Sequence, residues 1–374
     1  MIYLDNAATS FPKAPQVAQA MAGALEKAGA NPGRSGHRLA LAAGRIVWGC
    51  REQLAALLGV ADPSRVVFCQ SCTDALNTAI HGILRPGDHA VATLLEHNSV
   101  LRPLSERARA GLNPLTLVHP GPDGRVTPEG VRAALTRRTR LVVFTHCSNV
   151  TGVLQDVRPI AALCRRAGVT LLVDAAQSLG LVPARPDELG ADLLAFPGHK
   201  GLLGPHGTGG LYVREGVALR PLRQGGTGSM SESMFQPEDM PDRFESGTLN
   251  LPGIAGLAAG VRFLCQHEAE IAAHHRRLCE RLRAGLGAIP GVALYSPPGS
   301  LLVSFNVRAL ASGEVADALD ARGIAVRGGL HCAPGAHQLL GTLETGAVRV
   351  SPGPFNTDAD VDRLLEAVAA IARR

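Results

Sequence analysis

The stretch TLLVDAAQSLGLVPARPDELGADLLAFPGHK, residues 170–200, contains two short apolar runs that are each followed by a polar side chain. The runs Thr170–Val173 and Leu193–Phe196 have the length and composition of buried strands. Asp174 directly follows the first run, and Lys200 follows the second inside a glycine-rich turn. The intervening sequence fits one helix and one strand, so we expect both side chains to reach the same crevice.

Similar apolar runs recur between about residue 65 and residue 215 and alternate with amphipathic stretches such as Pro159–Ala167. Near-continuous apolar strands separated by helices are typical of a mainly parallel sheet that is covered on both faces. Such sheets bind ligands outside the carboxyl ends of their strands, so the residues after each run are the first candidates for a site. The predicted strands are Val66–Cys69, Ala90–Leu94, Leu115–Val118, Leu141–Thr145, Thr170–Val173, Leu193–Phe196 and Gly210–Val213.

A second region begins near Leu251, where the pattern predicts a long helix over Leu251–Leu286. Its later half contains His274 and His275, but no further ligands lie at the spacing of a metal site, so we expect a solvated helix face. The elements that follow predict a small α+β domain. They are the strands Leu301–Asn306, Ile324–Arg327 and Ala347–Ser351, the helix Ser312–Arg322 and a C-terminal helix from Asp358.

Length and composition are those of a globular protein of two domains. The chain has 374 residues, of which 46% are apolar and 18% are charged, so disorder caused by charge is excluded. The net charge of +5 is spread thinly along the chain. The densest basic run, residues 137–140, contains no aromatic side chain on which a base could stack, which argues against nucleic-acid binding.

No segment has the pattern of a signal peptide or a membrane span. The eight cysteines are scattered along a long chain and are not packed as in a small disulfide scaffold. We therefore expect reduced thiols, a cytoplasmic location and no membrane partner.

Lys200 and Asp174 carry the most informative chemistry. A partly desolvated lysine can lose its proton and attack a carbonyl, and a Schiff base with pyridoxal phosphate is one such outcome. Asp174 could pair with a protonated pyridine nitrogen, and Gln177 could donate to an oxygen of the ring. A solvent-exposed Lys200 and a helix cap at Asp174 are the structural alternatives.

Residues at another strand end could bind a phosphate. Ser71, Cys72 and Thr73 open a helical pattern, where hydroxyl and backbone N–H groups bind an anion or simply cap the helix. Cys69 and Cys72 form a CxxC, which we interpret as incidental because no second such pair exists.

Two further polar residues follow predicted strands. His97 could stack on a flat ring, or it could be a core histidine with satisfied hydrogen bonds. Asn149 offers both a donor and an acceptor, and an ordinary turn is the alternative.

In the second region, Cys332 and Arg349 are the candidate functional residues. Cys332 lies in the glycine-rich loop Val326–Pro334, beside a histidine, where an exposed and reactive thiol is favoured over a small buried one. Arg349 lies between Val348 and Val350 in a predicted strand, so it needs a partner. A substrate carboxylate and an internal Asp or Glu would serve equally well.

Taken in order, the motifs resemble those of the class V aminotransferase family of fold-type I pyridoxal-phosphate proteins. The loop from Arg327 to Cys332, followed by Arg349, is similar to that of the cysteine desulfurases of the group II, SufS-like branch. The resemblance spans nearly the whole chain. Its motifs are YLDNAAT at 3–9, EHN at 96–98, DAAQ at 174–177, GHK at 198–200 and FESGT at 244–248.

The resemblance implies an α/β fold of type I with two domains. An N-terminal segment, residues 1–14, would associate with the small domain, and residues 15–250 would form the large pyridoxal-phosphate domain, with a mainly parallel mixed sheet flanked by helices. Residues 251–374 would form a linking helix and the small α+β domain. The implied activity is a cysteine desulfurase that converts L-cysteine to L-alanine and passes the sulfur from a persulfide on Cys332 to an acceptor.

The resemblance also implies a homodimer and a role for each site residue, without a metal. Lys200 would bind the cofactor and move protons, and Asp174 would pair with the ring nitrogen. The remaining roles would be Gln177 for the ring oxygen, His97 for stacking on the ring, Cys72, Thr73 and His199 for the phosphate, Thr248 for the phosphate of the partner subunit, Asn149, Arg327 and Arg349 for the substrate, and Cys332 for the sulfur.

Other activities remain open at the level of sequence. A selenocysteine lyase or another class V lyase, epimerase or transaminase would share the cofactor residues, and a non-catalytic sulfur carrier would need only Cys332. Pro197 and Leu330 depart from the SufS-like pattern, which has a serine and a histidine there. The acceptor and the pathway, such as iron–sulfur cluster assembly, do not follow from the sequence.

Overall fold

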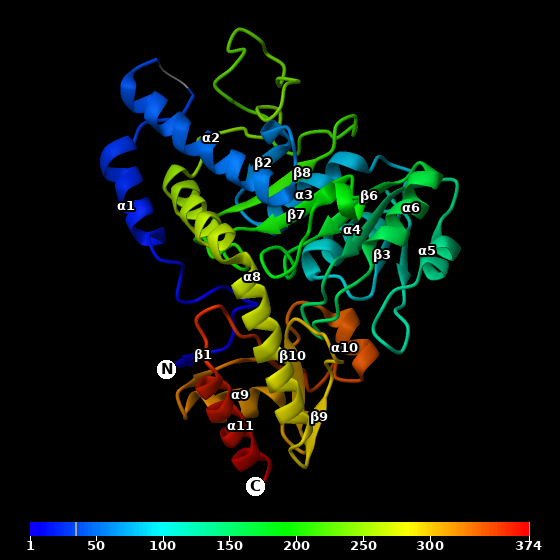
Figure 1. Ribbon diagram of the computed structural model, residues 1–374. Helices are drawn as coiled ribbons and strands as arrows, with labels where there is room; N and C mark the ends of the chain where they lie inside the picture. Colours follow the sequence, from blue (N-terminus) through cyan, green and yellow to red (C-terminus); the bar gives the residue numbers. More distant parts are fainter. Residues whose placement is uncertain (34–35, 374) are drawn as a thin grey trace.

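The chain folds into a large α/β domain and a smaller α+β domain that are joined by one long helix (Figure 1). The computed structural model describes residues 1–33 and 36–373. The joining helix, α8 (Leu251–Gly287), runs from the large domain into the small one. The α/β architecture that the alternating apolar and amphipathic stretches predict is confirmed.

The large domain is built on a seven-stranded sheet with the strand order β2-β8-β7-β6-β5-β3-β4. β8 is antiparallel to both of its neighbours, and the pairs from β7 across to β4 are parallel. All seven predicted strands are present, with ends that differ from the predicted ends by at most two residues. They are β2 (Val66–Cys69), β3 (His89–Thr93), β4 (Leu115–Val118), β5 (Thr139–Thr145), β6 (Thr170–Asp174), β7 (Leu193–Pro197) and β8 (Gly209–Val213).

Side chains of the central strands alternate between two apolar cores, as expected for a sheet that is buried on both faces. Leu171 and Val173 of β6 lie in the core formed with α2, α6 and α8. Leu172, between them, lies in the core formed with α3 and α4. The helices of the large domain are α1 (Val17–Ala28), α2 (Arg38–Leu58), α3 (Cys72–Ile83), α4 (Asn98–Arg109), α5 (Pro128–Ala134), α6 (Val157–Ala167) and α7 (Pro186–Leu189), with the short 3-10 helix η1 (Pro63–Arg65).

The surroundings of α8 change along its length. Its first part packs in the large-domain core, and its last turns pack against α11 (Asp358–Ala372) in the small domain. The backbone leaves helical geometry at His267, where φ is −127°. The expected solvated face is wrong for His275, which is buried with Nε2 2.8 Å from the carbonyl oxygen of Leu301, because the small domain covers that side of the helix.

The small domain contains an antiparallel sheet with the strand order β12-β13-β10-β9. β1 (Ile2–Tyr3) pairs in parallel with β11 (Ile324–Ala325) in a separate two-stranded sheet, so the N-terminal residues lie against this domain. The single strand predicted over Ile324–Arg327 is therefore wrong, because the chain leaves β11 after Ala325 and Arg327 pairs with Arg349 in the other sheet. The other elements are β9 (Val292–Leu294), β10 (Val303–Val307), α9 (Ser312–Asp320), β12 (Arg327–Gly329), α10 (Pro334–Leu340) and β13 (Ala347–Val350).

With 37 residues, α8 is longer than a membrane crossing requires, but its later half is rich in charged side chains. Across residues 1–33 and 36–373, no helix combines the length and the apolar composition of a membrane span.

Candidate active site

A cavity of about 210 Å³ lies where the carboxyl ends of β5, β6 and β7 face the small domain. Asp174 and Lys200 both line it, so the structure brings these two strand ends into one crevice. Thr248 is the one predicted site residue that lies elsewhere. The predicted residues that line the cavity are Cys72, Thr73, His97, Asn149, Asp174, Gln177, His199, Lys200, Arg327, Cys332 and Arg349.

Lys200 follows a tight turn that starts where β7 ends at Pro197. A side chain at Gly198 would place its Cβ 2.1 Å from the hydroxyl oxygen of Thr208, so the turn requires glycine there. The Lys200 amine lines the cavity, and burial together with the Arg349 cation lowers its pKa. A larger fraction of the amine is therefore uncharged and able to act as a nucleophile.

Asp174 ends β6 and is 4% exposed. Its Oδ1 accepts the N–H of Ala176 at 2.9 Å and the thiol of Cys72 at 3.6 Å. Burial raises the pKa of Cys72, so this thiol stays protonated and can donate a hydrogen bond. Cys69 and Cys72 are both free thiols, so the CxxC contains no disulfide. Residues 176–178 form a turn, so Asp174 is not a helix cap, and its Oδ2 has no hydrogen-bond partner among the residues described.

The first turn of α3 forms one end of the cavity. Ser71 caps this helix, since its hydroxyl accepts the N–H of Asp74 at 3.1 Å. Thr73 Oγ1 lies 2.7 Å from Ser99 Oγ. His199 Nδ1 is buried without a partner in the described part of the chain, and burial lowers the pKa of His199 to about 3, which leaves the ring neutral. A helix N-terminus beside an unpartnered ring nitrogen is suited to an anion.

His97 lines the cavity and also caps α4. Its Nδ1 accepts the N–H of Ser99 at 3.0 Å, and burial lowers the pKa of the ring. Because Ser99 Oγ also contacts Thr73, one hydroxyl links the histidine to the first turn of α3. Ser99 was not among the residues predicted for the site, since its only local signal is a hydroxyl in the first turn of a helix after a strand end.

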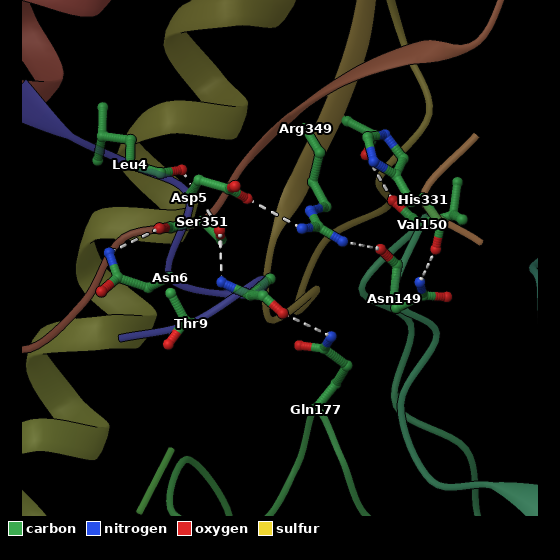
Figure 2. A network of polar contacts seen from close by, with 12 residues as sticks. Leu4, Asp5, Asn6, Thr9, Asn149, Val150, Gln177, His331, Arg349 and Ser351 are labelled. Atoms are coloured by element: carbon green, nitrogen blue, oxygen red, sulfur yellow. Dashed lines mark hydrogen bonds and ion pairs between the residues drawn. The ribbon is translucent and has the colours of Figure 1, made fainter. Parts of the chain in front are cut away.

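Figure 2 shows Arg349 between the N-terminal segment and the large domain. Arg349 is 2% exposed, and its Nη2 lies 2.9 Å from Asp5 Oδ1, while Nη1 donates to the backbone oxygen of Asn149 at 3.1 Å. The internal acid that the sequence left open as a partner is therefore present. On the large-domain side, Gln177 Nε2 donates to the carbonyl oxygen of Ala7 at 3.1 Å.

Cys332 lies in the loop between β12 and α10, where it is exposed and lines the cavity. His331 and Cys332 both adopt left-handed backbone geometry, with φ of 50° and 58°, which is unfavourable for side chains other than glycine. Bonds to the large domain hold the loop: Asn98 N donates to the Cys332 carbonyl at 2.7 Å, and Asn149 Nδ2 donates to the His331 carbonyl at 2.6 Å. On the other side, His331 Nε2 lies 3.0 Å from the carbonyl oxygen of Ala347. The expected exposure of Cys332 is confirmed, and Cys265 is the other exposed thiol.

The cavity is rich in positive charge. The guanidinium groups of Arg327 and Arg349 line it, beside the Lys200 amine, against one lining carboxylate, Asp174. His331 adds no charge, because burial and the Arg349 cation lower its pKa to about 2. Such a surface attracts anionic groups such as phosphate and carboxylate.

Thr248 lies in a separate hollow of about 150 Å³ that Arg223 and Asn250 also line. Gly247, directly before it, has φ of 94°, a left-handed conformation that glycine adopts without strain. Within one chain, Thr248 therefore does not reach the groups that line the cavity.

The residues present fit pyridoxal phosphate. Its ring nitrogen would meet the Asp174 carboxylate, its aldehyde would meet the Lys200 amine, and its phosphate would meet the first turn of α3 and the unpartnered Nδ1 of His199. These groups line one cavity and are the donors and acceptors that such a cofactor needs. Within residues 1–33 and 36–373, no three His, Cys, Asp or Glu side chains are grouped to hold a metal ion.

Comparison with known proteins gives full-length matches. The profile of the aminotransferase class-V family matches residues 2–364. A probable cysteine desulfurase of Methanothermobacter thermautotrophicus is 36% identical, with 99% of this chain and 94% of the relative covered, and one of Pseudomonas aeruginosa is 37% identical, with 98% and 93% covered.

Solved structures agree with these matches. A cysteine desulfurase from Thermococcus onnurineus superimposes with a TM-score of 0.93 at 32% identity, covering 100% of this chain and 94% of that one. A cysteine desulfurase from Escherichia coli gives 0.90 at 29% identity, with 99% and 94% covered.

Proposed function

The chain belongs to the aminotransferase class-V family, and we propose that it is a pyridoxal-phosphate-dependent cysteine desulfurase. It converts L-cysteine to L-alanine and carries the sulfur as a persulfide on Cys332 before transfer to an acceptor. The family and the fold that the sequence motifs imply are confirmed by the match over residues 2–364 and by the solved structures. Membership of the SufS-like branch stays a prediction.

One observation carries the proposal: an exposed thiol, Cys332, lines the same cavity as the Lys200 amine and the Arg349 guanidinium. A transaminase needs the amine and the guanidinium but has no use for a thiol. A desulfurase needs a soft nucleophile within reach of the substrate's sulfur, and a cysteine supplies it.

The large-domain residues hold the cofactor. When bound, pyridoxal phosphate supplies an electron sink for bonds at the substrate's Cα. Lys200 would bind the cofactor and move a proton at the substrate carbon, and the Asp174 carboxylate would keep the ring nitrogen protonated. Gln177 would donate to the ring oxygen, and His97 would stack on the face of the ring. The phosphate would be bound by Cys72, Thr73 and His199.

The small-domain residues handle the substrate. Arg349, with Asn149 and Arg327 beside it, binds the carboxylate of L-cysteine. The Cys332 sulfur attacks the substrate's sulfur, so an S–S bond forms while the C–S bond breaks. The electron pair of that bond stays with Cβ, which accepts a proton from Lys200 and becomes the methyl group of alanine.

We also infer a homodimer and a sulfur acceptor. The separate hollow around Thr248 supports a role for this residue at the phosphate of the partner subunit's cofactor. The exposure of Cys332 suits transfer of sulfur to an acceptor protein. The cytoplasmic location stays a prediction.

Product analysis tests the function. The cofactor-loaded protein, incubated with L-cysteine and a reducing thiol, should form alanine and sulfide in equal amounts. Without the reducing thiol, mass spectrometry should find a persulfide on Cys332. If the loaded protein forms no alanine from L-cysteine, the proposal fails, and alanine from selenocysteine alone would identify a selenocysteine lyase.

A further inference from the structure

Arg349 is a buried cation that uses only part of its hydrogen-bonding capacity. Its Nη2 donates to Asp5 Oδ1 at 2.9 Å, and its Nη1 donates to the backbone oxygen of Asn149 at 3.1 Å. Its Nε is buried and has no partner among the residues that the structure describes. The guanidinium carries more N–H donors than these two contacts use, and Arg349 lines the cavity, so donors remain for a ligand there.

Asp5 is placed beside Arg349 by the backbone around it. Asp5 and Ser351 form a parallel bridge, and the Ser351 N–H donates to the carbonyl of Leu4 at 2.7 Å. Ser351 Oγ accepts the N–H of Ala7 at 2.8 Å. These bonds, several of which Figure 2 shows, attach the N-terminal segment to the end of β13, so the Asp5 carboxylate meets the guanidinium at a defined position.

We propose that Asp5 is a positioning residue that holds Arg349 for the carboxylate of the amino-acid substrate. This inference rests on the proposed function. Asp5 does not line the cavity, so it acts through Arg349: its pairing with Nη2 fixes the plane of the guanidinium, whose remaining donors bind the substrate.

The charges around Arg349 support this role. A second guanidinium, that of Arg327, lines the same cavity, and Asp5 is the carboxylate that forms an ion pair with Arg349. Burial lowers the pKa of Arg349, and Asp5 opposes this effect. Without Asp5, the guanidinium would be a buried cation with no carboxylate to orient it, which is unfavourable in a partly closed cavity.

Asp5→Asn tests the inference in the cofactor-loaded enzyme, because the amide keeps an oxygen acceptor and removes the charge. We expect the KM for L-cysteine to rise about tenfold, as for the weakening of one charge-assisted hydrogen bond, while kcat changes less than about twofold. Binding of cysteamine, which is L-cysteine without its carboxylate, should be unchanged when followed by cofactor absorbance. Asp5→Glu keeps the charge at a shifted position and should have a smaller effect on KM.

Ser351→Ala is the matched control, since it removes one hydroxyl bond to the segment but keeps the backbone bridge between Asp5 and residue 351 and the ion pair with Arg349. Its KM for L-cysteine should stay near the wild-type value. If Asp5→Asn weakens L-cysteine and cysteamine binding alike, or changes neither, Asp5 does not position Arg349. A wild-type protein that binds L-cysteine but releases no alanine would contradict the proposed function instead, and the two binding titrations would still test Asp5.

Discussion

The two walls of the cavity are built differently. On the large-domain wall, Asp174 and Lys200 follow central strands of a seven-stranded sheet whose two faces are buried. On the small-domain wall, Cys332 is exposed on left-handed backbone, and Arg349 has an unpartnered Nε. Groups that must stay in place are therefore carried by parallel strands, whereas the group that must pass sulfur outward lies on a loop that solvent reaches.

The largest expected effect concerns the large-domain wall. The chain has three lysines, and of these only Lys200 lines the cavity. Lys200→Ala should lower turnover about 10⁴-fold or more and should abolish the yellow colour of the purified protein, because no other amine can bind the cofactor there. Absorbance spectra and alanine release measure both effects.

Lys13→Ala is the control for this change. Burial lowers the pKa of Lys13 to about 8, but this residue does not line the cavity. A yellow Lys13→Ala protein beside a colourless Lys200→Ala protein would show that position, and not a lowered pKa alone, selects the lysine. A yellow Lys200→Ala protein with normal turnover would contradict the claim that the large-domain wall binds the cofactor through Lys200.

The next largest effect concerns the small-domain wall, where a substitution should lower turnover without affecting cofactor binding. Cys332→Ala should lower alanine formation from L-cysteine about 10²-fold or more while the yellow colour remains, because the change is confined to the small-domain wall. Cys265→Ala, at the other exposed thiol, should behave as wild type in the same assay. Loss of colour in Cys332→Ala would mean that the loop also supports the cofactor.

The smallest effect concerns a buried acid behind the large-domain wall. Glu96 is fully buried, and its Oε1 accepts the hydroxyl of Thr93 at 2.8 Å and the N–H of Thr145 at 2.9 Å. Burial raises the pKa of Glu96 to about 8. Between its ordinary pKa and pH 8 the folded protein holds a proton that the unfolded chain releases, so Glu96 makes the free energy of unfolding fall as the pH rises through this range.

Glu96→Gln cannot titrate, so its stability should fall less than that of the wild type between pH 5 and pH 8. We expect the difference to be about 1–3 kcal/mol, from urea unfolding at the two pH values. Glu106→Gln, at an exposed acid that pairs with Arg109, should follow the wild type. Parallel pH profiles for wild type and Glu96→Gln would show that Glu96 is ionised when folded.

Local patterns were sufficient to predict the large-domain wall. The apolar runs before Asp174 and Lys200 are short enough for strands, and the carboxyl ends of parallel strands meet at one edge of a sheet. The exposure of Cys332 also followed from a polar, glycine-rich loop. These signals depend only on neighbouring residues, so they can be recognised in a single amino-acid sequence.

Features that depend on distant residues could not be predicted in this way. Nothing near His275 indicates that the small domain covers it, and nothing near Val326 indicates that the chain changes from one sheet to another. From its neighbours in the strand, Arg349 could have paired with either a substrate or an internal acid. The structure supplies Asp5, which is 344 residues away in the chain.

Strand length, glycine turns and residue type are local properties, so the order of amino acids is enough to identify the residues that end the strands and the side chains that carry chemistry. Which of these side chains meet depends on how the whole chain folds. Folding places the N-terminal segment, the strand ends of one domain and a loop of the other around a single cavity, and the charges and hydrogen bonds of that cavity exist only after this assembly.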